Sequence, residues 1–148
     1  MQISDILSLE RTLCDVGSSS KKTTLEILAS LIASADSSLR QTEVFNSLLA
    51  RERLGSTGLG HGIALPHCRL KHLDKTIGAF IKLQSGIDYD AIDHKPVDLL
   101  FALAVPEEPT QEHLDILAKL AELFDNDNFL GRLREKPSRD DVFKLLII

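Results

Sequence analysis

The chain has 148 residues, of which 43% are hydrophobic and 26% charged, and its formal net charge is −5 at pH 7. This length fits one domain with a real core, and the acidic balance argues against a nucleic-acid binder, whose affinity rests on Lys and Arg. No apolar run reaches the roughly 20 residues of a membrane span, the first ten residues lack a signal-peptide pattern, and two cysteines outside any disulfide framework favour a reducing cytoplasm.

The first half of the chain is expected to contain a brief helix, one strand and two longer helices. The strand covers Thr12–Val16. Ser20 can cap a helix that runs to about residue 35, and a second helix spans residues 40–53 before Gly55 ends it. The first long helix places apolar residues at i, i+3, i+4 and i+7, on one face, at Leu25, Leu28, Ala29 and Ile32.

The second half is expected to supply two strands and two helices. Thr76–Leu83 and Val97–Val105 read as strands, and the second is almost wholly apolar, which predicts a central strand buried on both faces. Thr110–Phe124 is a strong helix, and Ser138, with an aspartate three residues on, resembles a capping box that opens a last helix. Helices and strands alternate irregularly, which indicates the α/β class, with a mixed sheet and helices packed against it.

A glycine-rich loop follows the second long helix. Half of the chain's eight glycines lie within residues 55–62, and such clusters let main-chain N–H groups approach an anion closely. Arg51 can add a planar cation suited to phosphate oxygens. The loop lacks the Lys-Ser/Thr ending of a P-loop, and a plain turn remains the alternative interpretation. The candidate phosphate-binding residues of this loop are Ser56, Thr57, Gly58 and Gly60.

His67 comes directly after this loop and is the candidate for chemistry. Pro66 fixes its own φ and pushes Leu65 toward an extended conformation, so the His67 backbone is expected to be held at a strand end. A neutral imidazole is a good phosphoryl acceptor near neutral pH, because one ring nitrogen carries a free lone pair. The product brings negative charge and requires donors already in place around it. This chemistry calls for no diffusible cofactor.

His113 is the second candidate. It lies in the first turn of the helix expected at residues 110–124, at the end of its apolar stripe. A helix N-terminus favours anions, so His113 could donate a hydrogen bond to a phosphoryl group on His67, provided that the two meet in space. The alternative is a histidine that is simply satisfied within the core.

Two other chemistries could use the same segment. His61, His67, Cys68 and His72 suggest a metal, but their spacing fits no standard zinc pattern, so no metal is expected. Cys68 beside His67 suggests a thiol nucleophile, but adjacent residues on an extended segment point to opposite faces. Phosphoryl transfer on His67 is therefore preferred.

The run from Gly62 to His67, Gly-Ile-Ala-Leu-Pro-His, resembles the active-site motif of enzyme IIA domains of the mannitol/fructose class. These domains belong to the bacterial phosphoenolpyruvate-dependent phosphotransferase system. Residues 51–60 and 91–103 resemble the nitrogen-related member more than the sugar-transporting ones, and the likeness extends over nearly the whole chain. His61 and Cys68 depart from the pattern, in which Asn and Gly are familiar beside this motif.

The resemblance implies both a fold and a reaction. The fold is a single enzyme IIA domain over residues 1–148, with a mixed sheet flanked by helices on both sides. His67 would accept a phosphoryl group from an HPr-like phosphocarrier protein, His113 would support that group, and Arg51 would lie near the site. The docking face should surround His67, with an apolar patch that includes Leu59 and Ile63 and with acidic residues on its rim.

The resemblance also leaves three functions to compare. In the nitrogen-related branch the phosphorylation state regulates target proteins, typically in nitrogen metabolism and potassium transport. In the sugar branch the phosphoryl group passes to a IIB cysteine. A binding module that acts without phosphorylation is the third. The first of these is favoured, with no role for nucleic acid or for membrane insertion.

Overall fold

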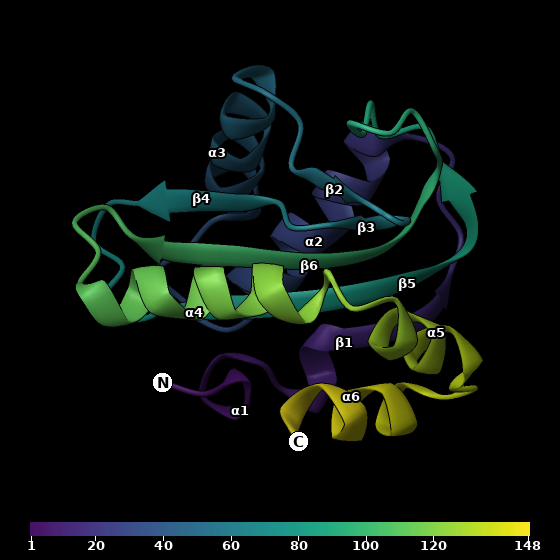
Figure 1. The fold of residues 1–148 in the computed structure, drawn as a ribbon. Helices are drawn as coiled ribbons and strands as arrows, with labels where there is room; N and C mark the ends of the chain where they lie inside the picture. The colour runs from purple at the N-terminus through teal and green to yellow at the C-terminus, as the bar shows by residue number, and fades with distance from the viewer.

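A mixed six-stranded sheet carries helices on both of its faces (Figure 1). The computed structural model describes residues 1–148. The strand order is β1-β5-β6-β3-β2, and β4 pairs with β6 in line with β3. The expected α/β class and two-sided helix cover are confirmed. The strands are β1 (Thr12–Val16), β2 (Gly58–Gly60), β3 (Ile63–Ala64), β4 (His67–Leu70), β5 (Ile77–Ile87) and β6 (Val97–Pro106).

Two helix layers cover the sheet. One layer holds α2 and α3, and the other holds α4, α5 and α6 together with the short α1 (Figure 1). No helix combines the length and the apolar character needed to cross a bilayer. The helices are α1 (Ile3–Ile6), the 3-10 helix η1 (Leu9–Arg11), α2 (Lys21–Ala33), α3 (Gln41–Arg53), α4 (Gln111–Leu123), α5 (Asp127–Glu135) and α6 (Arg139–Ile147).

Side-chain caps begin three of these helices. The hydroxyl of Ser20 accepts from the Thr23 N–H at the start of α2, and that of Ser138 accepts from the Asp141 N–H at the start of α6. Both predicted helix starts are therefore confirmed. Helix α5, which is capped by the side chain of Asn126, was not predicted from the sequence.

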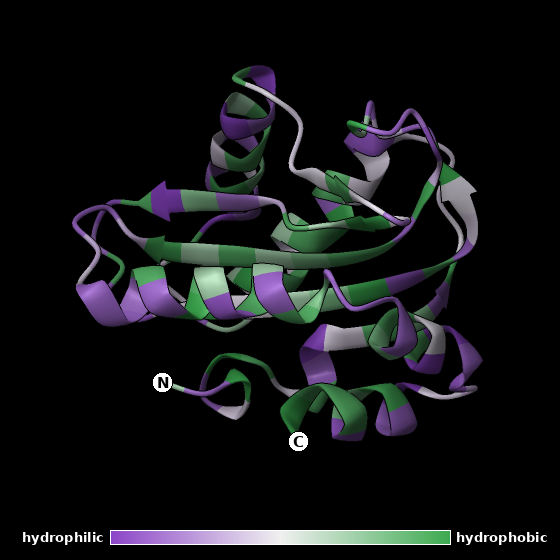
Figure 2. Cartoon of the chain, in the orientation of Figure 1, coloured by the Kyte–Doolittle hydropathy of each residue, from purple (hydrophilic) through white to green (hydrophobic).

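The central strand β6 divides the interior into two cores. Alternate residues face opposite layers, and the strand is buried from Val97 to Pro106 except for the half-buried Asp98. This confirms the predicted strand with two buried faces, which Figure 2 shows as a nearly continuous hydrophobic ribbon. Leu100, Ala102 and Ala104 face α2 and α3, whereas Leu99, Phe101 and Leu103 face α4 and α6.

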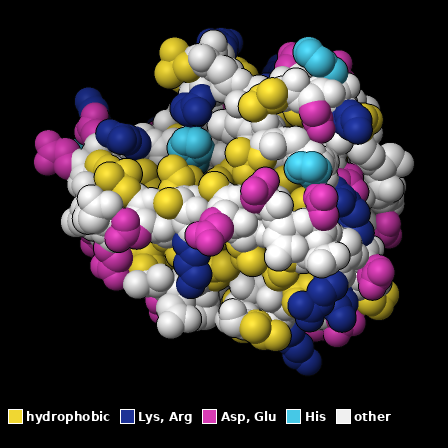
Figure 3. All heavy atoms as spheres, viewed as in Figure 1, with side chains coloured by type: hydrophobic (Ala, Val, Ile, Leu, Met, Phe, Trp, Pro, Cys, Tyr) yellow, Lys and Arg dark blue, Asp and Glu magenta, His cyan; other side chains and the backbone are white.

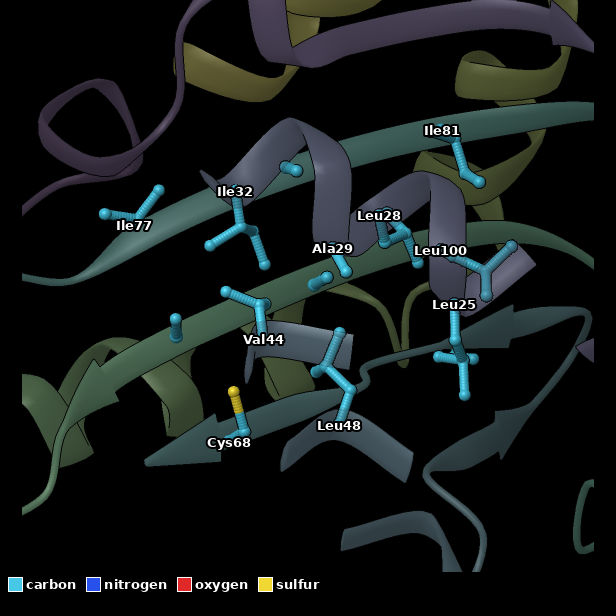
Figure 4. Close-up of a cluster of buried hydrophobic side chains, with 14 of the residues drawn as sticks. Leu25, Leu28, Ala29, Ile32, Val44, Leu48, Cys68, Ile77, Ile81 and Leu100 are labelled. Atoms are coloured by element: carbon cyan, nitrogen blue, oxygen red, sulfur yellow. The ribbon is translucent and has the colours of Figure 1, made fainter. Parts of the chain in front are cut away.

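The α2/α3 core is built by the helix face that the spacing predicted. Leu25, Leu28 and Ile32 of α2 are fully buried and pack in the core between the α2/α3 layer and the sheet (Figure 4). Cys68 of β4 turns into the same cluster, near Val44 and Leu48 of α3. Burial of this kind contributes roughly 1.5–3 kcal/mol for each large aliphatic side chain.

β3 and β4 are two pieces of one interrupted strand. Both run parallel to β6, with Ile63 opposite Leu99 and His67 opposite Leu103. Pro66 lies in the interruption, where its carbonyl accepts from the Leu103 N–H at 2.9 Å. The interruption makes His67 the first residue of β4, whose only strand partner is β6 and whose outer edge lies between α3 and α4 (Figure 1).

Candidate phosphoryl-transfer site

A pocket of about 370 Å³ opens along β4, between α3 and α4. Its polar side chains come from three elements: His67 and Arg69 from β4, Ser47 and Arg51 from α3, and His113 from α4. Figure 3 shows this region as a histidine side chain beside basic groups and apolar surface. A larger cavity of about 510 Å³, between α4, α5 and α6, has neither histidine nor cysteine in its lining. The apolar lining of the β4 pocket is Ala50, Leu54, Cys68, Val105, Leu114 and Leu117.

The backbone fixes the tautomer of His67. Nδ1 lies 2.8 Å from the Leu65 carbonyl oxygen, which can only accept, so Nδ1 carries the proton. Nε2 of the neutral ring then holds the free lone pair. The same turn that interrupts the strand at Pro66 therefore selects the ring nitrogen that can act as a nucleophile.

Burial keeps the His67 ring neutral. Its pKa lies below the ordinary 6.5, chiefly because desolvation disfavours the charged imidazolium. The hydrogen bond to the Leu65 carbonyl and the negative charge of Glu52 oppose this, whereas the positive charges of Arg51 and Arg69 lower the pKa further. A half-buried histidine with a depressed pKa presents its lone pair at neutral pH without first losing a proton.

His113 has the opposite tautomer. The Thr110 N–H donates to His113 Nδ1 at 3.0 Å, in a capping box at the start of α4. With Nδ1 accepting, the neutral ring carries its proton on Nε2 and can donate from there. The expected placement of His113 in the first turn of α4 is confirmed, and both histidines line one pocket. His67 thus offers an acceptor nitrogen and His113 a donor nitrogen.

Arg51 lies at the pocket, as expected, but one of its donors is committed. Nη1 donates to the Gly55 carbonyl at 2.8 Å, which ties the guanidinium to the turn that ends α3. The remaining donors stay available for an anion. Arg69 also lines the pocket, and the sequence analysis did not select it. The signal was present, because Arg69 is two residues beyond His67 on an extended segment and shares its face.

The glycine-rich loop does not line this pocket. Gly58 and Gly60 form β2, on the far side of β3, and Ser56 hydrogen-bonds the Gly58 N–H. The N–H and hydroxyl of Thr57 both donate to the carboxylate of Glu52. The structure therefore brings His67, His113 and Arg51 together but leaves the four loop residues apart from them.

A buried acidic network lies behind the pocket, and sequence reasoning missed it. Glu52 has a side chain only 2% exposed, next to Arg51 in the last turn of α3. Its carboxylate accepts from Lys21 Nζ at 2.9 Å as well as from Thr57. Because the Thr57 hydroxyl donates to Glu52, the Tyr89 hydroxyl donates to Thr57 in turn, at 3.2 Å. The network joins the end of α3 to the loop that the glycines form.

The docking patch differs from the expected one. Ile63 is fully buried, because β3 has strand neighbours on both sides and lies under the α4 layer. Leu59 is 39% exposed but is not part of the pocket. The exposed apolar residues at the pocket are instead Leu54, 85% exposed, and Leu114, 40% exposed. No carboxylate lines the pocket itself.

Nearly the whole chain matches one protein family. Residues 5–147 match the family model described as phosphoenolpyruvate-dependent sugar phosphotransferase system, EIIA 2. The chain belongs to this family. A nitrogen regulatory protein of Pseudomonas aeruginosa is 41% identical over 147 residues, which are 99% of this chain and 96% of that protein. The resemblance drawn from the run that ends at His67 is confirmed, and the protein is a phosphotransferase-system component with a phosphocarrier role.

Solved structures of enzyme IIA proteins share the fold. The crystal structure of nitrogen regulatory protein IIA-Ntr from Neisseria meningitidis has a TM-score of 0.91 and 41% identity, covering 97% of this chain and 98% of that one. The mannitol IIA of Escherichia coli has a TM-score of 0.76 and 22% identity, covering 95% of this chain and 98% of that one. At 22% identity the likeness concerns the fold alone.

The two departures from the enzyme IIA motif are His61 and Cys68, of which only Cys68 lines the pocket. Cys68 is buried, and desolvation raises the pKa of its thiol to about 11, which removes it as a nucleophile. His61 is outside the pocket lining, and its Nδ1 lies 3.2 Å from the Asp127 carboxylate. The structure groups no three His, Cys, Asp or Glu side chains as a metal site.

Proposed function

We propose that this protein, acting in the cytoplasm as a single enzyme IIA domain over residues 1–148, accepts a phosphoryl group on Nε2 of His67 from an HPr-like phosphocarrier. The observation that carries the proposal is the pair of opposite tautomers in one pocket. The Leu65 carbonyl leaves Nε2 of His67 with its lone pair, and the Thr110 N–H leaves Nε2 of His113 with its proton.

The transfer balances without a cofactor. The lone pair on His67 Nε2 forms a bond to phosphorus as the N–P bond of the carrier's phosphohistidine breaks, and that electron pair returns to the carrier's nitrogen. The His67 ring becomes more positive in this step, and the proton stays on Nδ1, which donates its hydrogen bond to the Leu65 carbonyl. His113 Nε2–H and the free donors of Arg51 face the phosphoryl oxygens, whose negative charge they stabilise.

The exposed apolar groups at the pocket suit a protein donor rather than a small molecule. Leu54 and Leu114 stand on opposite sides of the pocket, on the end of α3 and the start of α4. A carrier whose phosphohistidine reaches His67 would cover both. Apolar area that is buried on docking contributes roughly 25 cal/mol per Å² before the costs of association.

The output of this reaction is a regulatory signal in our proposal. The nitrogen regulatory protein of Pseudomonas aeruginosa supports it, since it is 41% identical over 99% of this chain. The phosphorylation state of His67 would then control binding to target proteins, with nitrogen metabolism and potassium transport as the proposed outputs. If the sugar branch applies instead, the label on His67 passes to a IIB cysteine.

In vitro labelling tests the proposal. The protein is incubated with radiolabelled phosphoenolpyruvate, the first enzyme of the system and HPr-like carriers of the sugar and nitrogen branches. Carrier-dependent, acid-labile label is expected on wild type and on His72→Ala, a control histidine in an exposed turn, but not on His67→Ala. His113→Ala should be labelled more slowly. Label that persists in His67→Ala excludes His67 as the acceptor.

A binding comparison separates the regulatory proposal from a module that ignores phosphorylation. The unmodified protein, the phosphorylated protein and His67→Ala are each tested against a partner captured with wild type. Regulation requires that the phosphorylated protein bind differently from the other two. Equal affinity for all three would leave docking independent of the phosphoryl group.

A further inference from the structure

Arg69 lines the pocket but has no role in the proposed transfer to His67. It lies two residues after His67 on β4, so the two side chains share one face of the strand, whereas Cys68 and Leu70 point into the α2/α3 core. With a rise of about 3.3 Å per residue, the two β-carbons stand roughly 6–7 Å apart. An arginine side chain spans that distance.

The guanidinium of Arg69 has no protein partner. None of the four ion pairs includes it, and no hydrogen bond is made by its side chain. The main-chain carbonyl of Arg69 accepts a hydrogen bond from Ser47 Oγ. Arg51 differs, because Nη1 is held by the Gly55 carbonyl. Arg134 differs too, since it is fixed by a bidentate contact to Asp98. Arg69 is therefore the pocket cation whose donors are all free.

The charge of Arg69 reaches the acceptor. Together with Arg51 it disfavours protonation of His67, against the opposing charge of the buried Glu52 carboxylate behind the pocket. The carboxylate of Glu52 is held by Lys21 and Thr57, and no carboxylate lines the pocket itself to pair with Arg69. A dianionic phosphoryl group would supply the missing negative charge, and the planar guanidinium fork fits two of its oxygens at once.

We propose that Arg69 is a catalytic residue that binds the phosphoryl oxygens during transfer to His67 Nε2. This rests on the proposed function of His67 and adds a third side chain in contact with the phosphoryl group, beside Arg51 and His113. Arg51 approaches from α3, His113 from α4 and Arg69 along β4, so the three equatorial oxygens of the moving group each meet a donor. Arg69 moves no proton, because a guanidinium stays charged throughout. The bond made and the bond broken are those of the transfer scheme.

The test uses phosphoramidate as a small donor beside the carrier protein. Arg69→Gln should lower the rate of His67 phosphorylation by phosphoramidate about tenfold or more, as when one charge-stabilising donor is removed from a transfer site. Arg69→Lys should recover part of the rate, because it restores the charge without the fork. Arg53→Gln is the matched control: it makes the same charge change on an exposed arginine of α3 outside the pocket, and should react like wild type.

Phosphorus NMR supplies a readout that a structural role would not move. In the phosphorylated protein, loss of the Arg69 charge should raise the pKa of the phosphoryl group by about half a unit to one unit, whereas Arg53→Gln should leave it in place. A wild-type rate and a wild-type phosphoryl pKa in Arg69→Gln would overturn the inference.

Two further outcomes are distinct from that one. If Arg69→Gln is slow with the carrier but normal with phosphoramidate, Arg69 contacts the carrier and not the phosphoryl group, and the inference is wrong. If neither donor labels wild-type His67, the proposed function itself fails and takes the inference with it. Circular dichroism and a thermal melt of each variant establish that it is folded before its rate is compared.

Discussion

The buried carboxylate of Glu52 gives the sharpest stability prediction. It accepts from the ammonium of Lys21 at 2.9 Å and from both donors of Thr57, with its side chain 2% exposed. Glu52→Gln keeps the shape but removes the charge and turns an NH₂ group toward one of these donors. Each hydrogen bond to a charged group contributes about 1.5–3 kcal/mol. Allowing for what the amide oxygen recovers, we expect a loss of about 3 kcal/mol in the free energy of unfolding.

Urea unfolding measures this loss. With an m-value of about 1.5–2 kcal/mol/M, 3 kcal/mol lowers the unfolding midpoint by about 1.5–2 M. Glu43→Gln, an exposed glutamate on the same helix, should shift the midpoint by less than about 0.3 M. Removing Lys21 with Lys21→Met should cost less in the Glu52→Gln background than in wild type, with a coupling of about 1–3 kcal/mol. A Glu52→Gln variant as stable as wild type, or costs that simply add, would refute the network as a source of stability.

Three further predictions concern single positions. An NMR titration of the His67 ring should give a pKa below 6.5. Because the unfolded chain then binds more protons than the folded one, His67 lowers the stability of the fold increasingly as the pH falls through 6.5. A titration midpoint above 6.5 would contradict the desolvation of the ring. Lys82 donates to three carbonyls within residues 133–136, at the end of α5, so Lys82→Met should cost about 1–3 kcal/mol in urea unfolding, whereas exposed Lys75→Met should cost almost nothing. Gly62 has φ +80° and a β-carbon there would meet Arg134, so Gly62→Ala should lower the thermal midpoint, whereas Gly131→Ala, in open space on α5, should raise it slightly; the reverse order would refute the reasoning.

Local sequence patterns were enough for the elements whose signal is local. The 3.6-residue spacing of Leu25, Leu28 and Ile32 predicted the buried face of α2, and the apolar run in β6 predicted its two cores. The short pieces β2, β3 and β4 escaped prediction, because each exists only through pairing with a distant part of the chain. Ile63 was misplaced for the same reason, since its burial depends on the strands beside β3.

The candidate site shows the same division. A proline before His67 indicated a fixed acceptor, but the proton on Nδ1 depends on a carbonyl two residues earlier, which no residue pattern specifies. That His113 lines the same pocket could not be read from the sequence, because α4 reaches β4 only once β6 has been placed between them. The glycines suggested a loop that binds an anion, whereas the N–H and hydroxyl of Thr57 beside them both donate to the Glu52 carboxylate. The position of Arg69 could have been predicted, because residues two apart on an extended segment such as β4 share one face with each other.

The position of β4 at the edge of the sheet has a mechanical consequence. The pocket there is shared by α3, from one helix layer, and α4, from the other, so the two layers meet at this edge of the sheet. A phosphoryl group adds a charge of about −1.5 to −2 there. In the proposed reaction this one group would contact Arg51 on α3 and His113 on α4, and so would link the two helix layers at the edge of the sheet.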